Sequence, residues 1–273
     1  MNKYINTYYN NVTFGSGLTQ KTARTISSLS AAQLSDEFVK AYKIDANFKE
    51  NNVIAACSAI CADIYENLSK TFKLPLASTP KRIRVFTPED LIKPQRNSFG
   101  FCIADTKKVL KSEPPFELKS IFFQQHKLSV NDIDDITEEM HKKGINSTNH
   151  FLYEYIHEWA HNVHLDWIYN RYGYDGLCPY GRKVYQSEHP RGLKIVRKMH
   201  DTKFSSREKE VISSTVGTYA AESNPLELFA ETMAKLICDS LDNDTLLPKK
   251  NPFDGFSDFS EDFRDIFIRN THF

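Results

Sequence analysis

The sequence predicts an α+β fold in which a small mixed sheet is followed by helices. Three short segments with the alternation or aromatic content of strands lie together between residues 82 and 124. Apolar residues recur at helical spacing before and after that region, and the chain contains no internal repeat. With 273 residues and 40% apolar content, the chain is long enough to bury a substantial core.

The first third of the chain is predicted to be helical. Residues 1–28 are rich in Asn, Thr, Ser and Tyr and lack periodicity, which is typical of a loosely docked leader. Residues 30–42 and 48–72 both carry apolar side chains at the spacing of a helix. Two prolines then mark a connector, so we expect residues 1–75 to form an N-terminal leader and helical region.

The strands are predicted next. Residues 82–86 alternate in polarity, residues 99–104 form a short aromatic run, and residues 119–124 form a third strand. If the third strand lies at an edge of the sheet near the site, it can pair with an extended peptide. An internal position fits the same pattern equally well.

Helical patterns fill the rest of the chain. Besides the helix that carries the motif described below, they cover residues 132–143, 206–214, 225–240 and 259–270.

Composition excludes several classes of partner. Lys and Arg together number 35, as do Asp and Glu, so no bulk charge favours nucleic acid or an anionic membrane. No apolar run approaches the roughly 18 residues of a membrane span, and residues 1–17 lack the apolar core of a signal peptide. We therefore expect a cytoplasmic protein or one exported without a Sec-type signal; its oligomeric state stays open.

Cysteine usage indicates buried thiols. The five cysteines are odd in number and scattered, unlike a disulfide framework. Cys57 and Cys61 share a helical face, but neither a C-x-x-C pair nor nearby histidines support a metal site there, so they are predicted to be small core residues.

The most informative segment is His157-Glu158-Trp159-Ala160-His161, which matches the pattern H-E-x-x-H of helical zinc sites. A chain with this His and Glu content is expected to contain the pattern by chance only about 0.02 times. Two histidines four residues apart on a helix can bind one Zn²⁺ from the same face. Glu158 can then reach a metal-activated water as a general base.

The surrounding residues predict that the motif lies within a helix. Thr148 or Asn149 can cap its start and Gly173 can end it. An apolar stripe runs beside the histidines through Leu152, Tyr155, Ile156, Trp159, Ala160 and Val163. A metal site needs ligands that are held rigidly, and packed apolar side chains that exclude water hold them in this way.

A catalytic zinc site usually takes a third protein ligand, and Glu227 is the strongest candidate. It shares a face with Glu231 near the start of a predicted helix. Asn224 as N-cap and Pro225 at the first helical position make a capping role for Glu227 equally compatible with the spacing.

Two other candidates for the third ligand are weaker. His164 follows His161 by three residues, which favours a group beside the ligands or at the surface over a ligand. Asp175 lies among Asp, Gly and Pro residues whose composition is explained by a turn.

The segment Tyr219-Ala220-Ala221-Glu222-Ser223-Asn224-Pro225-Leu226-Glu227-Leu228-Phe229-Ala230-Glu231, downstream of H-E-x-x-H, resembles the gluzincin metallopeptidases. It is most similar to the catalytic domain of anthrax lethal factor. The resemblance implies a zincin-like metallopeptidase domain over residues 76–273, with a small mixed sheet, an active-site helix and C-terminal helices.

The same resemblance implies roles for three residues. Glu227 becomes the third zinc ligand, Glu231 the partner of a ligand histidine, and Tyr219 a group that stabilises the transition state. Tyr219 stands one residue further from Asn224 than the family pattern places it. The 66 residues from His161 to Glu227 also exceed the family separation, which fits an inserted loop around residues 172–190.

We therefore expect a zinc-dependent endopeptidase that cleaves a peptide or protein substrate, with Glu158 as general base. Tyr219 or His200 can donate to the developing oxyanion. The alternative is a non-catalytic zinc-binding protein that recognises peptides, an inactive relative of such enzymes. The intact Glu158 favours the enzyme, and a housekeeping or toxin-like effector role stays open.

Overall fold

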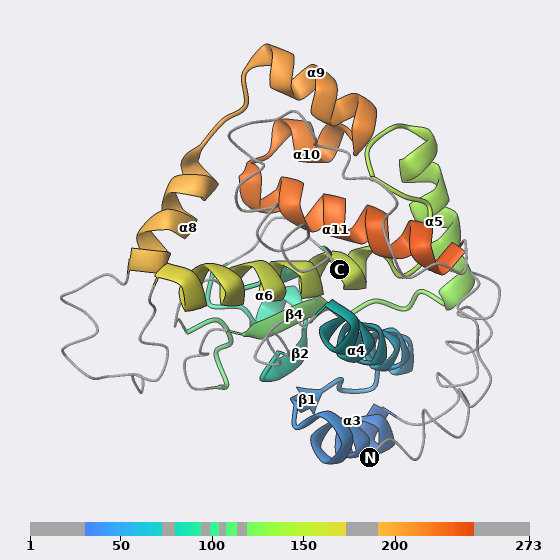
Figure 1. Cartoon of the computed structure of the whole chain (residues 1–273). Helices are drawn as coiled ribbons and strands as arrows, with labels where there is room; N and C mark the ends of the chain where they lie inside the picture. Colours follow the sequence, from blue (N-terminus) through green and yellow to red (C-terminus); the bar gives the residue numbers. More distant parts are fainter. Residues whose placement is uncertain are drawn as a thin grey trace.

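The computed structural model describes residues 31–72, 80–93, 99–103, 108–113, 119–172 and 191–242. Within these residues the chain forms a mixed α+β structure with one four-stranded sheet and eight α-helices (Figure 1). The predicted leader (1–28), the predicted helix 259–270, and residues 173–190 of the expected inserted loop lie outside the described residues.

The sheet has the strand order β1-β2-β4-β3 and is mixed. Its strands are β1 Asp45–Asn47, β2 Arg82–Phe86, β3 Gly100–Cys102 and β4 Ser120–Gln124. β1 and β4 pair with β2 in parallel, whereas β3 pairs with β4 antiparallel. The edge position considered for residues 119–124 is therefore wrong, because β4 is internal and β3 forms that edge.

Six of the helices were expected from the sequence. They are α3 (Ala31–Tyr42), α4 (Asn52–Phe72), α5 (Val130–Lys142), α6 (Tyr153–Tyr172), α9 (Ser206–Thr215) and α11 (Pro225–Asp242). The sequence did not predict α8 (Arg191–Asp201), α10 (Thr218–Glu222) or the short 3-10 turn η2 (Pro88–Asp90).

The motif-bearing helix begins later than expected. The predicted caps Thr148 and Asn149 lie before a turn, and α6 starts at Tyr153. The Nδ1 atom of His150 accepts a hydrogen bond from the backbone N–H of Leu152 at 3.1 Å, in the turn that precedes the helix.

The core joins α4 to α6 and to the sheet. Tyr65 of α4 stacks on Trp159 with ring centroids 5.4 Å apart and donates a hydrogen bond to the carbonyl of Ile156 at 2.9 Å. Cys57 and Cys61 are fully buried and form no disulfide, as predicted. α4 and β1, which belong to the predicted N-terminal region 1–75, contribute to this core and to the sheet.

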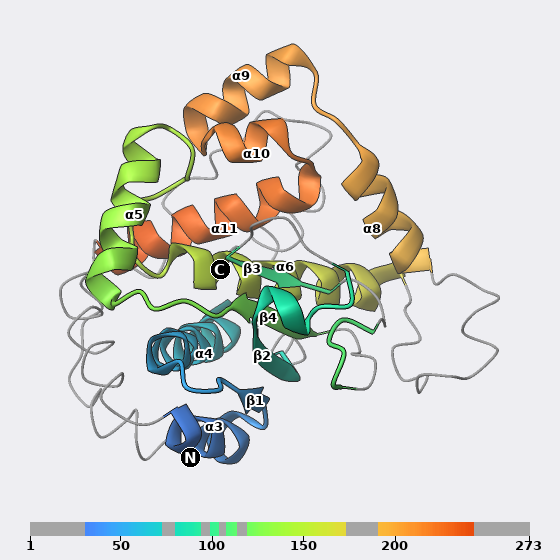
Figure 2. The ribbon, with the colours of Figure 1, turned by 180° about the vertical axis from the view of Figure 1, so that it is seen from behind.

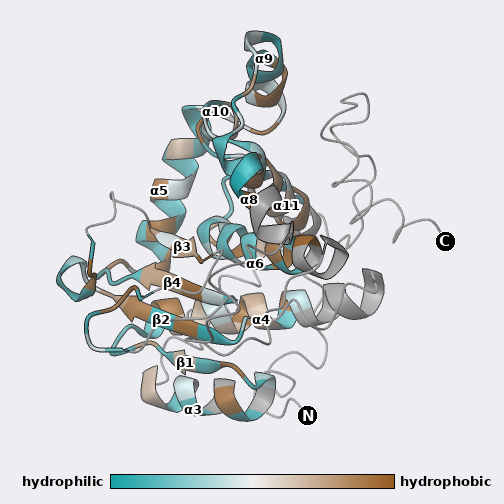
Figure 3. Ribbon diagram, turned by 90° about the vertical axis from the view of Figure 1, so that its left-hand side faces the viewer, coloured by the Kyte–Doolittle hydropathy of each residue, from teal (hydrophilic) through white to brown (hydrophobic). Residues whose placement is uncertain are grey.

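The views from other sides show how α6 is enclosed. Seen from behind, the sheet lies in front of α6, and α11 runs above it (Figure 2). Coloured by hydropathy, β2 and β4 are mainly apolar whereas α9 is mainly polar (Figure 3). Ile121 and Phe122, consecutive residues of β4 that point to opposite faces, are both fully buried, which agrees with a sheet covered on both faces.

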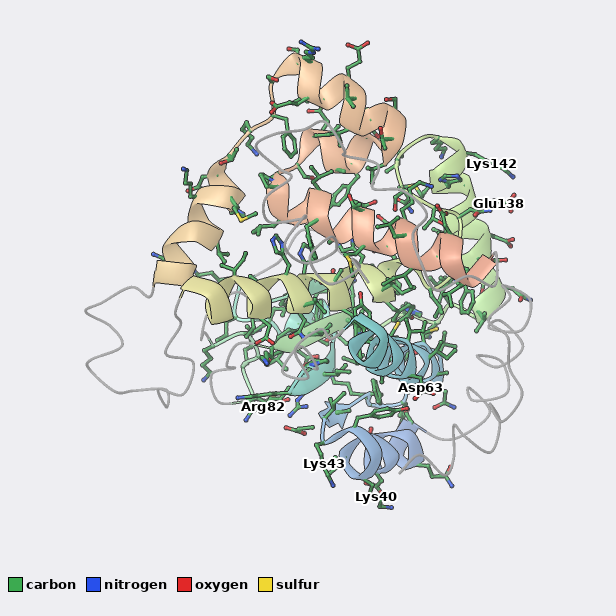
Figure 4. The ribbon with its side chains drawn as sticks, in the orientation of Figure 1. Lys40, Lys43, Asp63, Arg82, Glu138 and Lys142 are labelled. Atoms are coloured by element: carbon green, nitrogen blue, oxygen red, sulfur yellow. The ribbon has the colours of Figure 1, made fainter. Side chains whose placement is uncertain are left out.

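Charged side chains project outward from the outer helices (Figure 4). Glu138 and Lys142 form an exposed ion pair one helical turn apart on α5, at 2.6 Å. Such exposed pairs contribute little to stability. Among the described residues, no helix combines the length and the apolar character that crossing a bilayer requires.

Candidate metal centre

Two helices bring the candidate ligands together. His157 and His161 lie one turn apart on α6, and Glu227 lies in the first turn of α11. α11 packs along α6 (Figure 1), so the first turn of one helix faces the middle of the other. Within the described residues, these three side chains form the group that could hold a metal ion.

The three donor atoms converge closely. The Nε2 atoms of His157 and His161 are 3.0 Å apart, and the Oε2 atom of Glu227 lies 3.2 Å from each of them. Two ligands of a tetrahedral ion at about 2.1 Å from the metal are separated by roughly 3.4 Å. The observed triangle is only slightly tighter, so the residues fit a single ion bound by all three atoms.

Asn224 explains why Glu227 is available as a ligand. The side-chain oxygen of Asn224 accepts hydrogen bonds from the backbone N–H groups of Leu226 at 2.9 Å and Glu227 at 3.4 Å. The cap of α11 is therefore supplied by Asn224, as its position predicted. The Glu227 carboxylate turns toward the histidines, so a cap and a candidate ligand coexist in this turn.

A second carboxylate orients His157. The Oε1 atom of Glu231, one turn after Glu227, lies 2.9 Å from Nδ1 of His157. Glu231 is fully buried and also accepts hydrogen bonds from the Tyr153 hydroxyl and from the backbone N–H of Ser147, the latter at 3.2 Å. A proton on Nδ1 facing Glu231 leaves the lone pair of Nε2 directed at the ligand group.

The electrostatics of the group favour a positive charge between the carboxylates. Burial alone would raise the pKa of Glu227, but the charge of His161 and hydrogen bonds from both histidines hold that pKa far below its ordinary value. Burial alone would lower the pKa of His157, yet Glu227 and Glu231 raise it well above the usual value. This arrangement of carboxylates thus favours a cation at this point, whether proton or metal ion.

Glu158 is poised beside the ligands without being one of them. It follows His157 on α6 and is 5% exposed, and its Oε2 atom has no hydrogen-bond partner among the described residues. Burial raises the pKa of Glu158, which the charges of His161 and His157 oppose and that of Glu227 reinforces. A buried carboxylate with a raised pKa and a free oxygen is suited to accept a proton.

Tyr219 reaches the same point from α10. Its hydroxyl donates a hydrogen bond to Oε2 of Glu227 at 3.1 Å, and its ring centroid lies 6.1 Å from that of His157. The side chain is 43% exposed. The structure therefore brings Tyr219 to the ligand group despite its departure from the family spacing.

The remaining candidates lie elsewhere. His164 is buried and stacks on Phe229 with ring centroids 4.0 Å apart, and burial lowers its pKa to about 3. His200 is exposed on α8, with Nδ1 3.1 Å from Oδ1 of Asp201. Neither histidine belongs to the candidate metal group, and Asp175 lies outside the described residues.

Comparison of the chain with models of known protein families, with curated proteins and with solved structures gave no match. Any statement about function therefore depends on the site itself.

Three residues near this site were not predicted from the sequence. Tyr153 precedes His157 by one turn, and this spacing could have suggested a shared face. Burial raises the pKa of Glu154 to about 7, with the negative charges of Glu231 and Glu158 adding to the effect and His157 opposing it. Ser147 acts through its backbone N–H, which no side-chain pattern reveals.

Proposed function

We propose that this chain is a zinc-dependent endopeptidase with a zincin-like domain. The observation that carries the proposal is the convergence of two imidazole nitrogens and one carboxylate oxygen beside a buried glutamate, one oxygen of which has no hydrogen-bond partner among the described residues. Two histidines and one glutamate are a ligand set of catalytic zinc sites, which keep a further position open. The small mixed sheet, the motif-bearing helix and the later helices agree with the resemblance to gluzincins.

His157, His161 and Glu227 would hold the ion, and bound zinc supplies a lowered pKa for its water and polarisation of the scissile carbonyl. Glu158 accepts the proton of the attacking water and passes it to the leaving amine. Glu231 and Tyr153 keep His157 in the required tautomer. The Tyr219 hydroxyl, 3.1 Å from Oε2 of Glu227, would donate to the developing oxyanion.

The edge strand β3 supports a peptide as the substrate. Gly100, its first residue, lies against Glu158, and the strand has a hydrogen-bonded neighbour on one side in β4. An extended peptide can add to the other side through its backbone. This arrangement supports a substrate that is held by its backbone beside the proposed base.

The proposed function predicts about one zinc per chain in metal-replete protein and hydrolysis that a zinc chelator abolishes and added zinc restores. Elemental analysis measures the metal. Casein and a peptide library derived from a proteome measure cleavage, because the library also detects a narrowly specific enzyme. Folded, zinc-loaded protein that cleaves nothing in the library would favour a non-catalytic zinc protein instead.

Gly100→Ala is expected to reduce kcat at least about tenfold while zinc stays bound, since small misplacements of a catalytic group are costly. A Cβ at position 100 would stand 3.0 Å from Cγ of Glu158, from the carbonyl oxygen of Phe122 and from the ring of Phe123. The side chain that can yield most easily is Glu158. Steady-state kinetics with zinc analysis measures the effect, and Cys102→Ala on the same strand is the control. Wild-type kcat in Gly100→Ala would contradict this reading.

A further inference from the structure

We propose that Gly217 is a positioning residue that sets the Tyr219 hydroxyl at the ligand group through a close backbone fit. The proposal depends on the proposed function, because it concerns the group that would donate to the oxyanion. It adds a residue that contacts none of the proposed reacting atoms and acts through Tyr219.

Only glycine fits at position 217. Its φ angle is 141°, in a region that residues with a side chain rarely adopt. A Cβ there would stand 2.5 Å from the carbonyl oxygen of Ile145 and 3.1 Å from its carbonyl carbon. Both are backbone atoms, so an added side chain has to displace the chain and cannot be accommodated by a rotamer change.

The same contact anchors α10. The backbone N–H of Thr218 donates to the carbonyl of Gly144 at 2.8 Å, and that of Tyr219 donates to the carbonyl of Ile145 at 3.3 Å. The start of α10 is thus fixed to residues 144–145 directly after Gly217. Two residues after Gly217, the Tyr219 side chain reaches Glu227.

The exposure of Tyr219 makes this anchor decisive. With 43% of the residue exposed, side-chain packing constrains the ring only partly, so the backbone position largely decides where the hydroxyl lies. The anchoring segment is itself tied to the site, because the backbone N–H of Ser147 donates to Glu231. Residues 144–147 are therefore hydrogen-bonded both to α10, which carries Tyr219, and to Glu231, the carboxylate beside His157.

A double-mutant cycle tests this positioning role. Gly217→Ala and Tyr219→Phe are each expected to lower kcat roughly 100-fold with KM little changed, the scale of a displaced or deleted oxyanion donor. If Gly217 acts through Tyr219, Gly217→Ala causes no further loss in the Tyr219→Phe background. Multiplying losses in the double variant would overturn the proposal, as would wild-type kcat in folded Gly217→Ala.

A spectroscopic readout makes the test independent of turnover. In Co²⁺-loaded protein, loss of the Tyr219 hydrogen bond to Glu227 is expected to shift the visible absorption bands. Gly217→Ala should reproduce the Tyr219→Phe shift and add nothing to it in the double variant, whereas an unshifted Gly217→Ala spectrum would overturn the proposal. Absence of hydrolysis in wild type refutes the proposed function alone, because the cobalt comparison still reports the position of Tyr219.

Two further variants separate positioning from general loosening. Thr218→Pro removes the N–H bonded to Gly144 at the first position of α10, where proline is tolerated, and should show the same dependence on Tyr219 even if Gly217→Ala fails to fold. Lys209→Ala removes the exposed ion pair to Glu222 that ties α9 to α10, and should leave kcat and the cobalt spectrum unchanged. The proposal would be overturned if the kcat losses of Thr218→Pro and Tyr219→Phe multiplied in the double variant. It would also be overturned if Lys209→Ala lowered kcat as much as Gly217→Ala does.

Discussion

Glu158→Gln is expected to abolish most hydrolysis, by at least about 100-fold in kcat, while the zinc content stays unchanged. Glutamine preserves the shape of this buried α6 side chain, which lies against β3, but it cannot accept a proton. The loss is expected to be large because burial raises the pKa of this carboxyl and leaves one of its oxygens unbonded among the described residues.

Kinetics and elemental analysis of the same preparation separate the base from the metal ligands. Glu139→Gln, an exposed change on α5, is the matched control and should retain activity. Retained hydrolysis in Glu158→Gln would move the proton-accepting role to another group, with the partly buried Glu154 the first alternative to examine.

Glu227→Ala is expected to weaken zinc binding by more than about 100-fold, because it removes one of three converging donors. Loss of a group that only orients a ligand typically costs 10- to 100-fold, so Glu231→Ala should fall in that smaller range. Competition with a chromophoric chelator measures the zinc affinity of each variant. Activity alone would not distinguish loss of the ion from loss of a catalytic group.

Two control variants frame the Glu227 result. Glu222→Ala, at the exposed end of α10, should bind zinc as tightly as wild type. Asp175→Ala should do the same. If Asp175→Ala weakens zinc binding more than Glu227→Ala, the third ligand has been assigned to the wrong carboxylate.

The helices that carry the ligands were predictable because their signals are local. In α6 the two histidines and the apolar residues recur every three to four positions, the repeat of an α-helix. The apolar residues of α11 recur with the same spacing. The choice between a capping and a ligand role for Glu227 was not local. It depended on Asn224 supplying the cap and on α11 packing against α6.

Other features depend on contacts that no short sequence pattern records. β1 spans three residues and α10 spans five, too few for periodicity to emerge. The internal position of β4 follows from β3 pairing beside it, and the same aromatic sequence fits either place. The requirement for glycine at 217 arises from a carbonyl 72 positions earlier in the chain, at Ile145.

The ligand geometry also has a thermodynamic consequence. His161 and Glu227 are separated by 66 residues and belong to two packed helices, so a bound ion is a reversible cross-link that closes a long chain loop. Binding to the folded form alone stabilises that form in proportion to the logarithm of the free ion concentration. The packing of α11 on α6, and with it the stability of the folded form, would then vary with the concentration of free metal around the protein.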